Sequence, residues 1–479
     1  MKYISTRGSA APVSAERAIL SGIAPDGGLY LPETLPQLSE ETLAQLRTMP
    51  YRETALRVMQ PFLPSFTAEE LTACINDAYL RFDTKEPLRF QALDEKLTVM
   101  ELWHGPTAAF KDMALQLFPR LLPLCKKKCG NRDETWILTA TSGDTGKAAL
   151  EGFRDVPGTR IFVFYPFGGV SKIQELQMTT QQGSNVAVYA VRGNFDDAQT
   201  GVKRLFADER LKKSLKVRGI ELSSANSINW GRLLPQIVYY VYASAHLSEG
   251  EPVDFVVPTG NFGNILAAYL AKRMGAPVGR LICASNENRV LTDFFETGVY
   301  DRNRAFYKTY SPSMDILISS NLERLLYYAT DGDTAQVAAW MRELQTTGSY
   351  RVPVTIMSQL RAVFGFGSAD DEDTQKAIRL CKRKSGYLLD PHTAVGYSVY
   401  RALPESGRKT ALVSTASPFK FAQDVLRAFM DANTDGFTAQ DLLSMQSGRP
   451  VPQSLSRLKE MPVRFHDVIA PKDMEKVLG

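Results

Sequence analysis

The sequence predicts an α/β protein in which helices flank parallel β-sheets, preceded by a mainly helical N-terminal domain. From about residue 97, short apolar runs rich in β-branched and aromatic residues alternate with amphipathic helical segments. Parallel strands need a crossover connection, usually a helix, so this alternation is typical of parallel sheets. Of the 479 residues, 44% are hydrophobic and 23% are charged, which supplies enough apolar material for a sizeable core.

The first part of the chain, up to about residue 92, is predicted to consist of helices and loops. Two segments, SEETLAQLRTM and TAEELTACINDAYLRF, have helical periodicity and begin with a Ser or Thr suited to capping a helix. The preceding cluster APDGGLYLPETLP is rich in Pro and Gly and predicts turns. We therefore divide the chain into an N-terminal domain of residues 1–92, an α/β region of residues 93–431 and a C-terminal extension of residues 432–479.

Strand–helix pairs follow one another through the α/β region. The predicted strands, each followed by a loop and a helix, are ETWILTA, RIFVFYP, SNVAVYAV, VDFVVP and KTALVST. Between about residues 300 and 385 the pattern becomes mainly helical, and the polar stretch GSADDEDTQ predicts an exposed loop. The residues after about 432 predict a loose, charged extension.

The balance of charge argues against a nucleic-acid or membrane partner. The chain carries 56 basic and 52 acidic residues, a net charge of +4, and neither kind of partner needs so many acids. The sharpest basic run, CKKKCGNR, is predicted to be a solvated helix end. The N terminus lacks an apolar signal segment and no run of ~20 apolar residues occurs, so we expect a soluble, cytoplasmic protein.

The cysteines and histidines argue against both a disulfide framework and a metal site. Five cysteines are scattered along the chain, and only four histidines occur. Cys125 and Cys129 have a spacing that could hold a metal, but no cluster of further ligands lies nearby in the sequence. We expect reduced cysteines, as in the cytoplasm, and no bound metal.

Lys111 has an unusual position in the segment HGPTAAFKDMALQL. It is predicted to begin a helix whose same face continues through Ala114, Leu115 and Phe118, so its amine points toward apolar neighbours. Burial disfavours the charged form of an amine, and a neutral amine beside a phosphate site is what a Schiff base to pyridoxal phosphate requires. A lysine whose head group reaches water fits the same helix geometry, so both interpretations stay open.

Two loops after predicted strands suggest anion or substrate binding. TGNFGN, residues 259–264, follows a strand and opens a helix, where glycines and free N–H groups can hold a phosphate; a plain turn fits the pattern as well. TSGDTGK, residues 141–147, fails the phosphate-loop pattern because Thr141 and Ala148 stand where Gly and Ser or Thr are needed. It also lacks the G-x-S-x-G signature of a hydrolase. Its hydroxyl and carboxylate groups at a helix start suit a substrate carboxylate.

Two further polar segments allow either a structural or a functional interpretation. STASPFKF, residues 414–421, ends a strand with hydroxyls at the same predicted sheet edge, although these could simply cap the next helix. NSINWGR, residues 226–232, brings amides, a hydroxyl and a guanidinium into one short turn, although an ordinary capped turn has the same composition.

Together these segments resemble the threonine synthases, in the branch with an extra N-terminal domain. That branch belongs to the pyridoxal-phosphate enzymes folded like the tryptophan synthase β subunit. The likeness runs almost from end to end, in the family's order. The segments that carry it are ISTRG, GIAPDGGLYLP, LWHGPTAAFKDMA, TATSGDTG, YPFGGVSKIQELQM, TGNFGN, SPSMDILISSNLERLL and STASPFKF.

The resemblance implies a two-domain pyridoxal-phosphate fold with the site between two α/β subdomains. It also implies that Lys111 binds pyridoxal 5'-phosphate as an internal aldimine and later moves protons. The other implied cofactor residues are Gly260, Asn261, Phe262, Gly263 and Asn264 around the phosphate, Thr415 at the pyridine nitrogen, and Asp144 at the phenolic oxygen. The implied substrate residues are Ser142 and Thr145 at the carboxylate, and Asn226, Ser227 and Arg232 at the phosphate.

Asp144 departs from the wider fold group, in which an asparagine commonly meets the phenolic oxygen of the cofactor. A carboxylate beside a phenolate repels it unless one of the two holds a proton. The partner of that oxygen is therefore left open.

The activity implied is that of threonine synthase. It converts O-phospho-L-homoserine and water to L-threonine and phosphate by γ-elimination and β-addition of water, the last step of threonine biosynthesis. A phospho-lyase that makes 2-oxobutyrate, a serine or threonine dehydratase, and a non-catalytic binding protein of the same fold stay open as alternatives. We expect a monomer or homodimer that acts on a small molecule.

Overall fold

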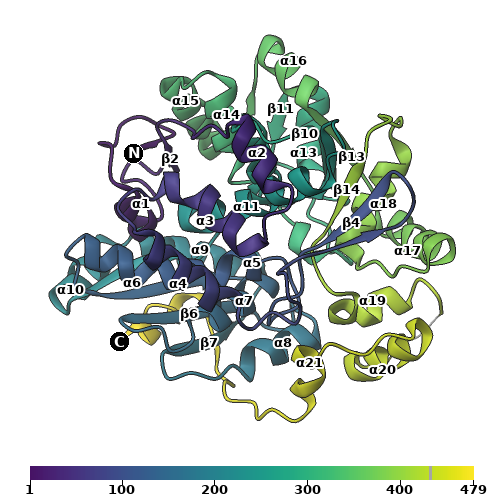
Figure 1. The fold of residues 1–479 in the computed structure, drawn as a ribbon. Coiled ribbons are helices and arrows are strands. Elements are labelled where there is room, and N and C mark those ends of the chain that lie inside the picture. The colour runs from purple at the N-terminus through teal and green to yellow at the C-terminus, as the bar shows by residue number, and fades with distance from the viewer. Residues whose placement is uncertain (431–433) are drawn as a thin grey trace.

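The computed structural model describes residues 1–430 and 434–479 (Figure 1). The N-terminal part contains helices, as predicted, and also a short two-stranded antiparallel sheet that was not predicted. Ser39 and Thr67 cap α2 and α4 by accepting backbone N–H groups, and Thr67 forms a capping box with Glu70. The elements are β1 (Tyr3–Ser5), α1 (Ala15–Ser21), β2 (Tyr30–Pro32), α2 (Glu40–Leu46), α3 (Tyr51–Met59), η1 (Gln60–Phe62) and α4 (Ala68–Tyr79).

A five-stranded sheet, at the lower left of Figure 1, has the order β15-β7-β6-β5-β8 and is parallel throughout. Three of the predicted strand–helix pairs, ETWILTA, RIFVFYP and SNVAVYAV, are found here. The strands are β5 (Glu134–Ala140), β6 (Thr159–Pro166), β7 (Val186–Val191), β8 (Ile220–Ser224) and β15 (Val468–Ile469). The helices are α6 (Phe118–Lys128), α7 (Asp144–Phe153), α8 (Lys172–Thr179), α9 (Phe195–Ala207) and α10 (Glu209–Val217).

A six-stranded sheet has the order β13-β10-β9-β14-β4-β3 and is parallel except for β3, which pairs antiparallel with β4. The strands are β3 (Arg89–Ala92), β4 (Leu97–Glu101), β9 (Val253–Pro258), β10 (Val278–Ser285), β13 (Phe364–Ser368) and β14 (Thr410–Ser414). The associated helices are α5 (Asp112–Leu115), α11 (Trp230–Leu247), α12 (Gly263–Arg273), α13 (Val290–Thr297), α16 (Val354–Val363), α17 (Asp371–Ser385) and α18 (Pro391–Ala402).

Smaller elements complete the described chain. A two-stranded sheet consists of β11 (Val299–Asp301) and β12 (Ser349–Arg351), and two helices, α14 (Leu322–Ala329) and α15 (Thr334–Thr346), lie between them in the sequence. The C-terminal helices are α19 (Ala422–Leu426), α20 (Gly436–Ser447) and α21 (Gln453–Ser456). The 3₁₀ turns are η2 (Pro312–Met314), η3 (Pro418–Phe421), η4 (Arg457–Lys459), η5 (Pro471–Asp473) and η6 (Lys476–Leu478).

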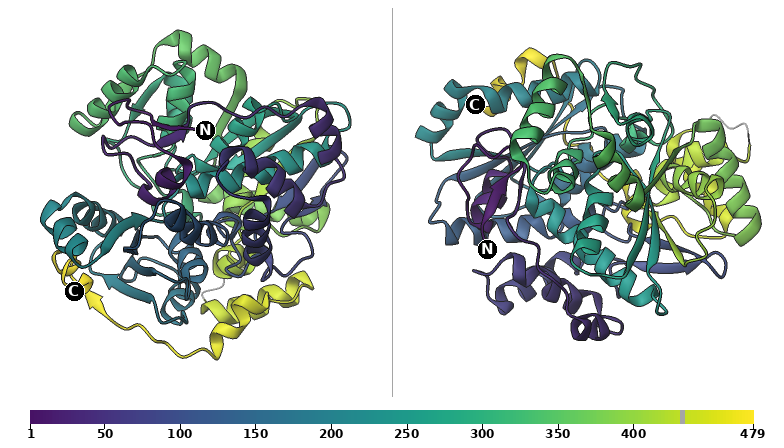
Figure 2. Two further views of the ribbon diagram at one scale, coloured as in Figure 1. Left: turned by 60° about the vertical axis from the view of Figure 1, so that its left-hand side comes forward. Right: turned by 90° about the horizontal axis from the view of Figure 1, so that it is seen from above.

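Helix α11 joins the N-terminal part to both sheets through one continuous core. Its residues from Trp230 to Ala245 are buried. The Trp230 ring packs edge-on against Tyr3 at 5.5 Å between centroids, and Tyr51 of α3 packs against Tyr242 at 5.3 Å. The N-terminal segment, purple in Figure 2, therefore lies against the α/β part and is not a separate body.

Two predictions about exposed segments were wrong, and a third was right except at one lysine. The stretch GSADDEDTQ is not a loop, because Asp370 caps α17 and the next three acidic residues form its first turn, where the helix dipole favours negative charge. Lys126 in CKKKCGNR is buried, although the run does end a helix: its ammonium donates to Gly158 O at 3.0 Å. The residues after 432 are not loose, because they contain α20 and buried apolar residues.

The C-terminal segment crosses from one side of the molecule to the other, as Figure 2 shows, and ends by adding β15 to the five-stranded sheet. It is anchored by apolar side chains, which are Ala439, Leu443, Leu455, Leu458, Met474 and Leu478. The domain boundary predicted at 431/432 falls within residues 431–433, which lie outside the described ones, and the predicted domain division stays a prediction. In the described ranges, no helix is long and apolar enough to cross a membrane.

Candidate active site

A cavity of about 1290 Å³ opens where the carboxyl ends of strands from both sheets meet. Loops that follow β4, β5, β8, β9 and β14 line it, as expected for a ligand site in an α/β fold. The structure therefore brings together segments far apart in the sequence. The predicted site residues that line this cavity are Lys111, Ser142, Thr145, Asn226, Ser227, Arg232, Gly260, Asn261, Phe262, Gly263, Asn264 and Thr415.

Lys111 lies at the N-terminal end of the four-residue helix α5, with its side chain at the cavity wall. The residue is 8% exposed, and Nζ donates to Ser313 Oγ at 3.2 Å and lies 3.7 Å from Asp144 Oδ2. Burial lowers the pKa of Lys111 to about 8, against the opposing charge of Asp144. An appreciable fraction of the amine is therefore neutral near neutral pH, as a nucleophile or base requires.

Asp144 is buried next to the cavity but does not line it, and its carboxylate oxygens accept hydrogen bonds from three side chains. Its Oδ1 accepts from Lys420 Nζ at 2.7 Å and from Gln174 Nε2 at 3.0 Å, and its Oδ2 accepts from Ser313 Oγ at 3.2 Å. Burial alone would raise the pKa of Asp144, but the charges of Lys420 and Lys111 outweigh it and hold the pKa well below its usual range. The Asp144 carboxylate is therefore ionised, and the neighbouring ammonium groups balance its negative charge.

His392 is a cavity residue that the sequence interpretation missed. Its Nδ1 contacts Asp390 Oδ1 at 3.0 Å, and its Nε2 faces the backbone N–H of Ser313 at 3.1 Å. Because a backbone N–H can only donate, Nε2 accepts this bond and Nδ1 carries the proton that is donated to Asp390. His392 thus fixes the loop that presents the Ser313 hydroxyl to Lys111.

The N-terminus of α12 has no side-chain cap. Its N-cap residue, Phe262, has left-handed backbone geometry (φ 63°) and provides no side-chain cap. The Phe262 ring packs in the core beside Phe364, 5.9 Å away between centroids, so this residue can serve the cavity only through its backbone. The first N–H groups of a helix carry a partial positive charge, which suits them to a phosphate.

Asn264 adds a side-chain donor to this helix end. Its Oδ1 accepts from the hydroxyls of Tyr239 at 2.5 Å and Tyr240 at 2.7 Å, which fixes the amide orientation. Its Nδ2 is buried without a partner in the described part of the chain. A buried donor without a partner is costly, and a bound phosphate oxygen would satisfy it.

Gly260 and Gly263 leave room that a side chain would fill. A Cβ on Gly260 would lie 2.8 Å from the backbone oxygen of Ser313, and one on Gly263 would lie 3.3 Å from Ser227 Cβ. We expect Gly263→Val to lower the affinity for pyridoxal 5'-phosphate by about tenfold or more, or ~1.4 kcal/mol, because the added methyls crowd the phosphate site. Titration of the apoprotein with the cofactor measures this.

Gly436 offers a matched control because it also begins a helix, α20, away from the cavity. A Cβ there would meet the flexible Ile173 side chain at 3.0 Å. Gly436→Val should therefore leave cofactor affinity within about twofold of the wild type. Equal affinity in Gly263→Val and the wild type would remove this helix end from the site.

Arg232 projects from α11 as a deeply buried cation at the cavity wall. It is 3% exposed, and its Nη1 donates to Ala225 O at 2.8 Å while its Nε has no partner in residues 1–430 and 434–479. Burial lowers the pKa of the guanidinium to about 10. No carboxylate lies within 4.0 Å of it in the described part of the chain, so a structural ion pair does not account for this arginine.

The loop before α11 is held from two sides. Asn229 caps the helix and also donates to Ile19 O at 2.9 Å, so part of NSINWGR is structural. Ser227 Oγ accepts from Asn321 Nδ2 at 3.1 Å. Arg324, fully buried, donates to Tyr30 O at 2.7 Å and to Ile228 O at 2.6 Å. Strand β2 of the N-terminal part therefore supports, through Arg324, the loop that carries Asn226 and Ser227.

Thr415 and the start of α7 complete the wall. Thr415 O accepts from Phe110 N at 2.8 Å, which joins the strand-end loop after β14 to the residue before Lys111. Ser142 and Thr145 lie half-buried beside Thr141, whose hydroxyl accepts from Gly143 N and Gly146 N at 3.0 and 2.9 Å. Thr141 therefore holds the turn and leaves the hydroxyls of Ser142 and Thr145 at the cavity.

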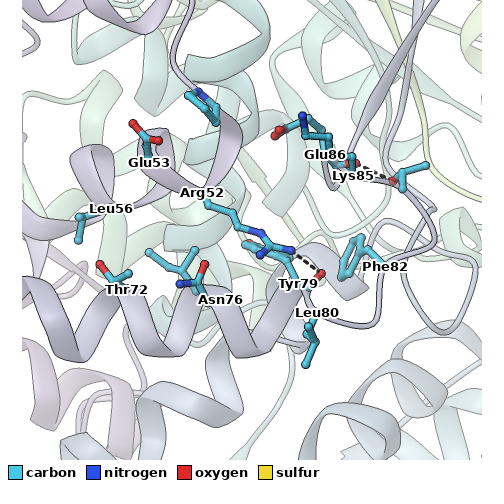
Figure 3. A pocket seen from close by; sticks show the side chains of 13 residues that line it. Arg52, Glu53, Leu56, Thr72, Asn76, Tyr79, Leu80, Phe82, Lys85 and Glu86 are labelled. Atoms are coloured by element: carbon cyan, nitrogen blue, oxygen red, sulfur yellow. Dashed lines mark hydrogen bonds between the residues drawn. The ribbon is translucent and has the colours of Figure 1, made fainter.

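A smaller hollow of about 580 Å³ lies on the N-terminal part, along α3 and α4 (Figure 3). Arg52 spans it and donates to Tyr79 O at 3.1 Å. Because Lys85, Glu53 and Glu86 also line it, its charges are balanced and do not favour an anion. The candidate chemistry therefore lies in the larger cavity.

Comparison with known proteins agrees with this geometry. Family models match along the chain: "Threonine synthase N terminus" at residues 2–79, "Pyridoxal-phosphate dependent enzyme" at residues 84–355 and "Threonine synthase, C-terminal" at residues 393–478. The threonine synthase of Pseudomonas aeruginosa is 43% identical over 89% of this chain and 90% of its own length.

The chain belongs to the threonine synthase family. The Saccharomyces cerevisiae relative is 37% identical over 89% of this chain and 88% of its own. Among solved structures, the pyridoxal-phosphate-bound threonine synthase from Brucella melitensis superposes with a TM-score of 0.90 at 38% identity, covering 100% of this chain and 98% of that one. The yeast enzyme gives 0.88 at 34% identity, covering 100% and 99%. The predicted family and fold are confirmed.

Proposed function

We propose that this chain converts O-phospho-L-homoserine and water to L-threonine and phosphate with bound pyridoxal 5'-phosphate. One observation carries the proposal: a single cavity is lined by an amine of lowered pKa, Lys111, and by two separate groups suited to bind anions. These are the end of α12, which has no side-chain cap, and Arg232, whose Nε has no hydrogen-bond partner among the described residues. A phosphate-bearing cofactor and a phosphate-bearing substrate need two such sites. We propose that the enzyme acts in the cytoplasm as a monomer or homodimer.

The residues present fit the cofactor. We propose that residues 260–264 hold its phosphate through backbone N–H groups and Asn264 Nδ2, and that the Thr415 hydroxyl faces its ring nitrogen. When bound, the cofactor supplies an electron-accepting ring that stabilises negative charge on substrate carbon. Lys111 would attach it covalently. Asp144, held by Lys420, would lie near its phenolic oxygen as an acceptor only.

Lys111 is also the group suited to move protons at the substrate carbons. Its lowered pKa lets the Nζ atom take up a proton and release it near neutral pH. The Ser313 hydroxyl accepts a hydrogen bond from Lys111 Nζ and donates its own proton to Asp144. It therefore orients the Lys111 amine, and the hydroxyl proton points toward Asp144 and not toward Lys111. His392 holds the Ser313 backbone in place for this contact.

Arg232 would bind the substrate phosphate and stabilise the charge that grows on it as the carbon–oxygen bond breaks. Asn226 and Ser227 would add neutral donors on the same loop. Ser142 and Thr145, at the start of α7, would bind the substrate carboxylate with help from the helix dipole. These contacts fix the substrate at both ends, which leaves its central carbons beside Lys111.

The test is an incubation with O-phospho-L-homoserine followed by identification of every product. We expect L-threonine and inorganic phosphate in equal amounts. A matched incubation with unphosphorylated L-homoserine should give no product above background, because Arg232 would then have no anion to bind.

Other products would contradict the proposal. Release of 2-oxobutyrate with phosphate would indicate a phospho-lyase that fails to add water. Turnover of serine or threonine at a comparable rate would indicate a dehydratase, and no turnover of any of these substrates by cofactor-loaded protein would indicate a binding protein.

A further inference from the structure

We propose that Lys420 is a positioning residue that balances the charge of Asp144, and thereby leaves Lys111 free to lose its proton. This inference rests on the proposed function only in that it treats Lys111 as the reactive amine. It assigns a role to a buried cation that does not line the cavity.

Lys420 is buried without contact to the cavity. It lies in η3, the turn after β14, and its side chain is 0% exposed. Its Nζ donates to Asp144 Oδ1 at 2.7 Å and to Thr107 O at 3.1 Å. Within 4.0 Å of this ammonium, Asp144 is the one carboxylate in the described residues. A charge this deep persists only when paired, so the two residues form a unit.

The two carboxylate oxygens of Asp144 bond to different partners. Oδ1 is occupied by Lys420 and by Gln174, both on the side away from the cavity. Oδ2 faces the Ser313 hydroxyl at 3.2 Å and Lys111 Nζ at 3.7 Å. Lys420 and Gln174 therefore set the orientation in which the second oxygen is presented to Lys111 through Ser313.

The role of Lys420 follows from the charges that surround Lys111. If Lys111 were the only cation beside the buried Asp144, loss of its proton would leave that carboxylate uncompensated, and the carboxylate would hold Lys111 protonated. With Lys420 present, the Asp144–Lys420 pair is neutral, and Lys111 can lose its proton without leaving a bare charge.

Other charged and titratable groups facing this cluster do not replace Lys420. Arg232 faces Lys111, and His392 faces Asp144. Asp112, the neighbouring buried carboxylate, is held by Thr107 N at 2.8 Å and by Gln116 Nε2 at 3.1 Å. Burial raises the pKa of Asp112 to about 6. None of these groups supplies a cation bonded to Asp144.

The experiment compares Lys420→Met, Asp144→Asn and the double variant. In cofactor-loaded protein, the visible absorbance reports whether the Lys111 nitrogen in its link to the cofactor is protonated, so a pH titration gives its midpoint. We expect Lys420→Met to raise this midpoint by about one pH unit or more and Asp144→Asn to lower it by a similar amount. We expect the double variant to return to within ~0.5 unit of the wild type.

Two control variants separate charge from packing. Lys420→Arg keeps the charge and should leave the midpoint within ~0.5 unit of the wild type. Lys126→Met removes another buried lysine, which is 8% exposed and bonded to backbone oxygens away from the cavity, and this change should leave the midpoint unchanged. Melting temperatures measured in parallel report the structural cost of each change.

The proposal is overturned if the midpoint of the double variant differs from that of the wild type by a full pH unit or more, or if Lys420→Met lowers the melting temperature without moving the midpoint. If Lys420→Met does not fold, the double variant decides: a midpoint displaced by a full unit overturns the proposal, and a near-normal one supports it. The readout of this experiment is a titration and does not depend on turnover. A product other than L-threonine would therefore contradict the proposed function and leave the role of Lys420 untouched.

Discussion

Lys111→Ala is expected to remove the visible absorbance of the cofactor-loaded protein and to lower kcat/KM by at least about 10⁴-fold. The variant loses both the amine that attaches the cofactor and the group that moves protons. Lys420 cannot take the place of Lys111, because Lys420 Nζ is bonded to Asp144 and Lys420 does not line the cavity. Absorbance spectra, reduction with borohydride and steady-state kinetics measure the effect.

The pH dependence of cofactor capture gives a second readout of Lys111. The neutral amine is the nucleophile, and burial lowers its pKa from the ordinary 10.5 to about 8. The rate at which wild-type apoprotein captures pyridoxal 5'-phosphate should therefore rise with pH up to about 8 and level off above it. Lys126→Ala, which removes an equally buried lysine outside the cavity, should leave colour and rate unchanged. A borohydride-reducible adduct in Lys111→Ala would assign the attachment to another residue.

Arg232→Ala is expected to lower kcat/KM for O-phospho-L-homoserine by ~10²-fold or more, equivalent to ~3 kcal/mol, with cofactor content unchanged. The guanidinium is buried without a carboxylate partner in the described part of the chain, and its Nε has no hydrogen bond there, so it can bind the substrate dianion that we propose for it. Arg232→Lys keeps the charge but not the forked geometry and should fall between the wild type and the alanine variant.

A matched buried arginine serves as the control for Arg232. Arg324 is fully buried and donates to backbone oxygens of Tyr30 and Ile228 but does not line the cavity. Arg324→Lys should lower the melting temperature while preference for the phosphorylated over the unphosphorylated substrate persists. In Arg232→Ala that preference, and inhibition by inorganic phosphate, should weaken. Loss of cofactor with retained substrate binding would instead assign Arg232 to the cofactor phosphate.

Sequence reasoning located the cavity wall because each of its segments follows its own strand. The loops at 141–147 and 259–264 could be recognised from local pattern alone, since a strand, a polar turn and a helix lie next to one another in the chain. The rule that carboxyl ends of parallel strands share an edge then brought them together. The roles of the individual side chains stay predictions.

The second layer of the site was missed because its contacts join distant segments. Lys420 meets Asp144 only after the two sheets have packed, and Ser313, which contacts Lys111, is 202 residues away from it in the chain. A signal was present, however: Lys420 stands between two phenylalanines in STASPFKF, the same apolar context that drew attention to Lys111. His392, preceded by Asp390 in DPHTA, carried a similar hint of a paired histidine.

The errors in the fold arose where composition was given more weight than position. Acidic residues from Asp371 onward look like a loop by polarity, yet the first turn of a helix is where such charges are favourable. The C-terminal segment looks loose because its surface is charged, while Leu443, Leu455 and Met474 are buried at wide spacing. Neither pattern gives a strong periodic signal.

The central position of β14 in the six-stranded sheet constrains how this chain can be made. β14, residues 410–414, lies between β9 and β4, which were synthesised long before it and do not pair with each other. As the polypeptide leaves the ribosome, both strands wait with open edges until the last strand of that sheet arrives. The nascent chain is thus exposed to aggregation from the synthesis of β4 until that of β14, and the half of the site built on this sheet forms only after residue 414 has been made.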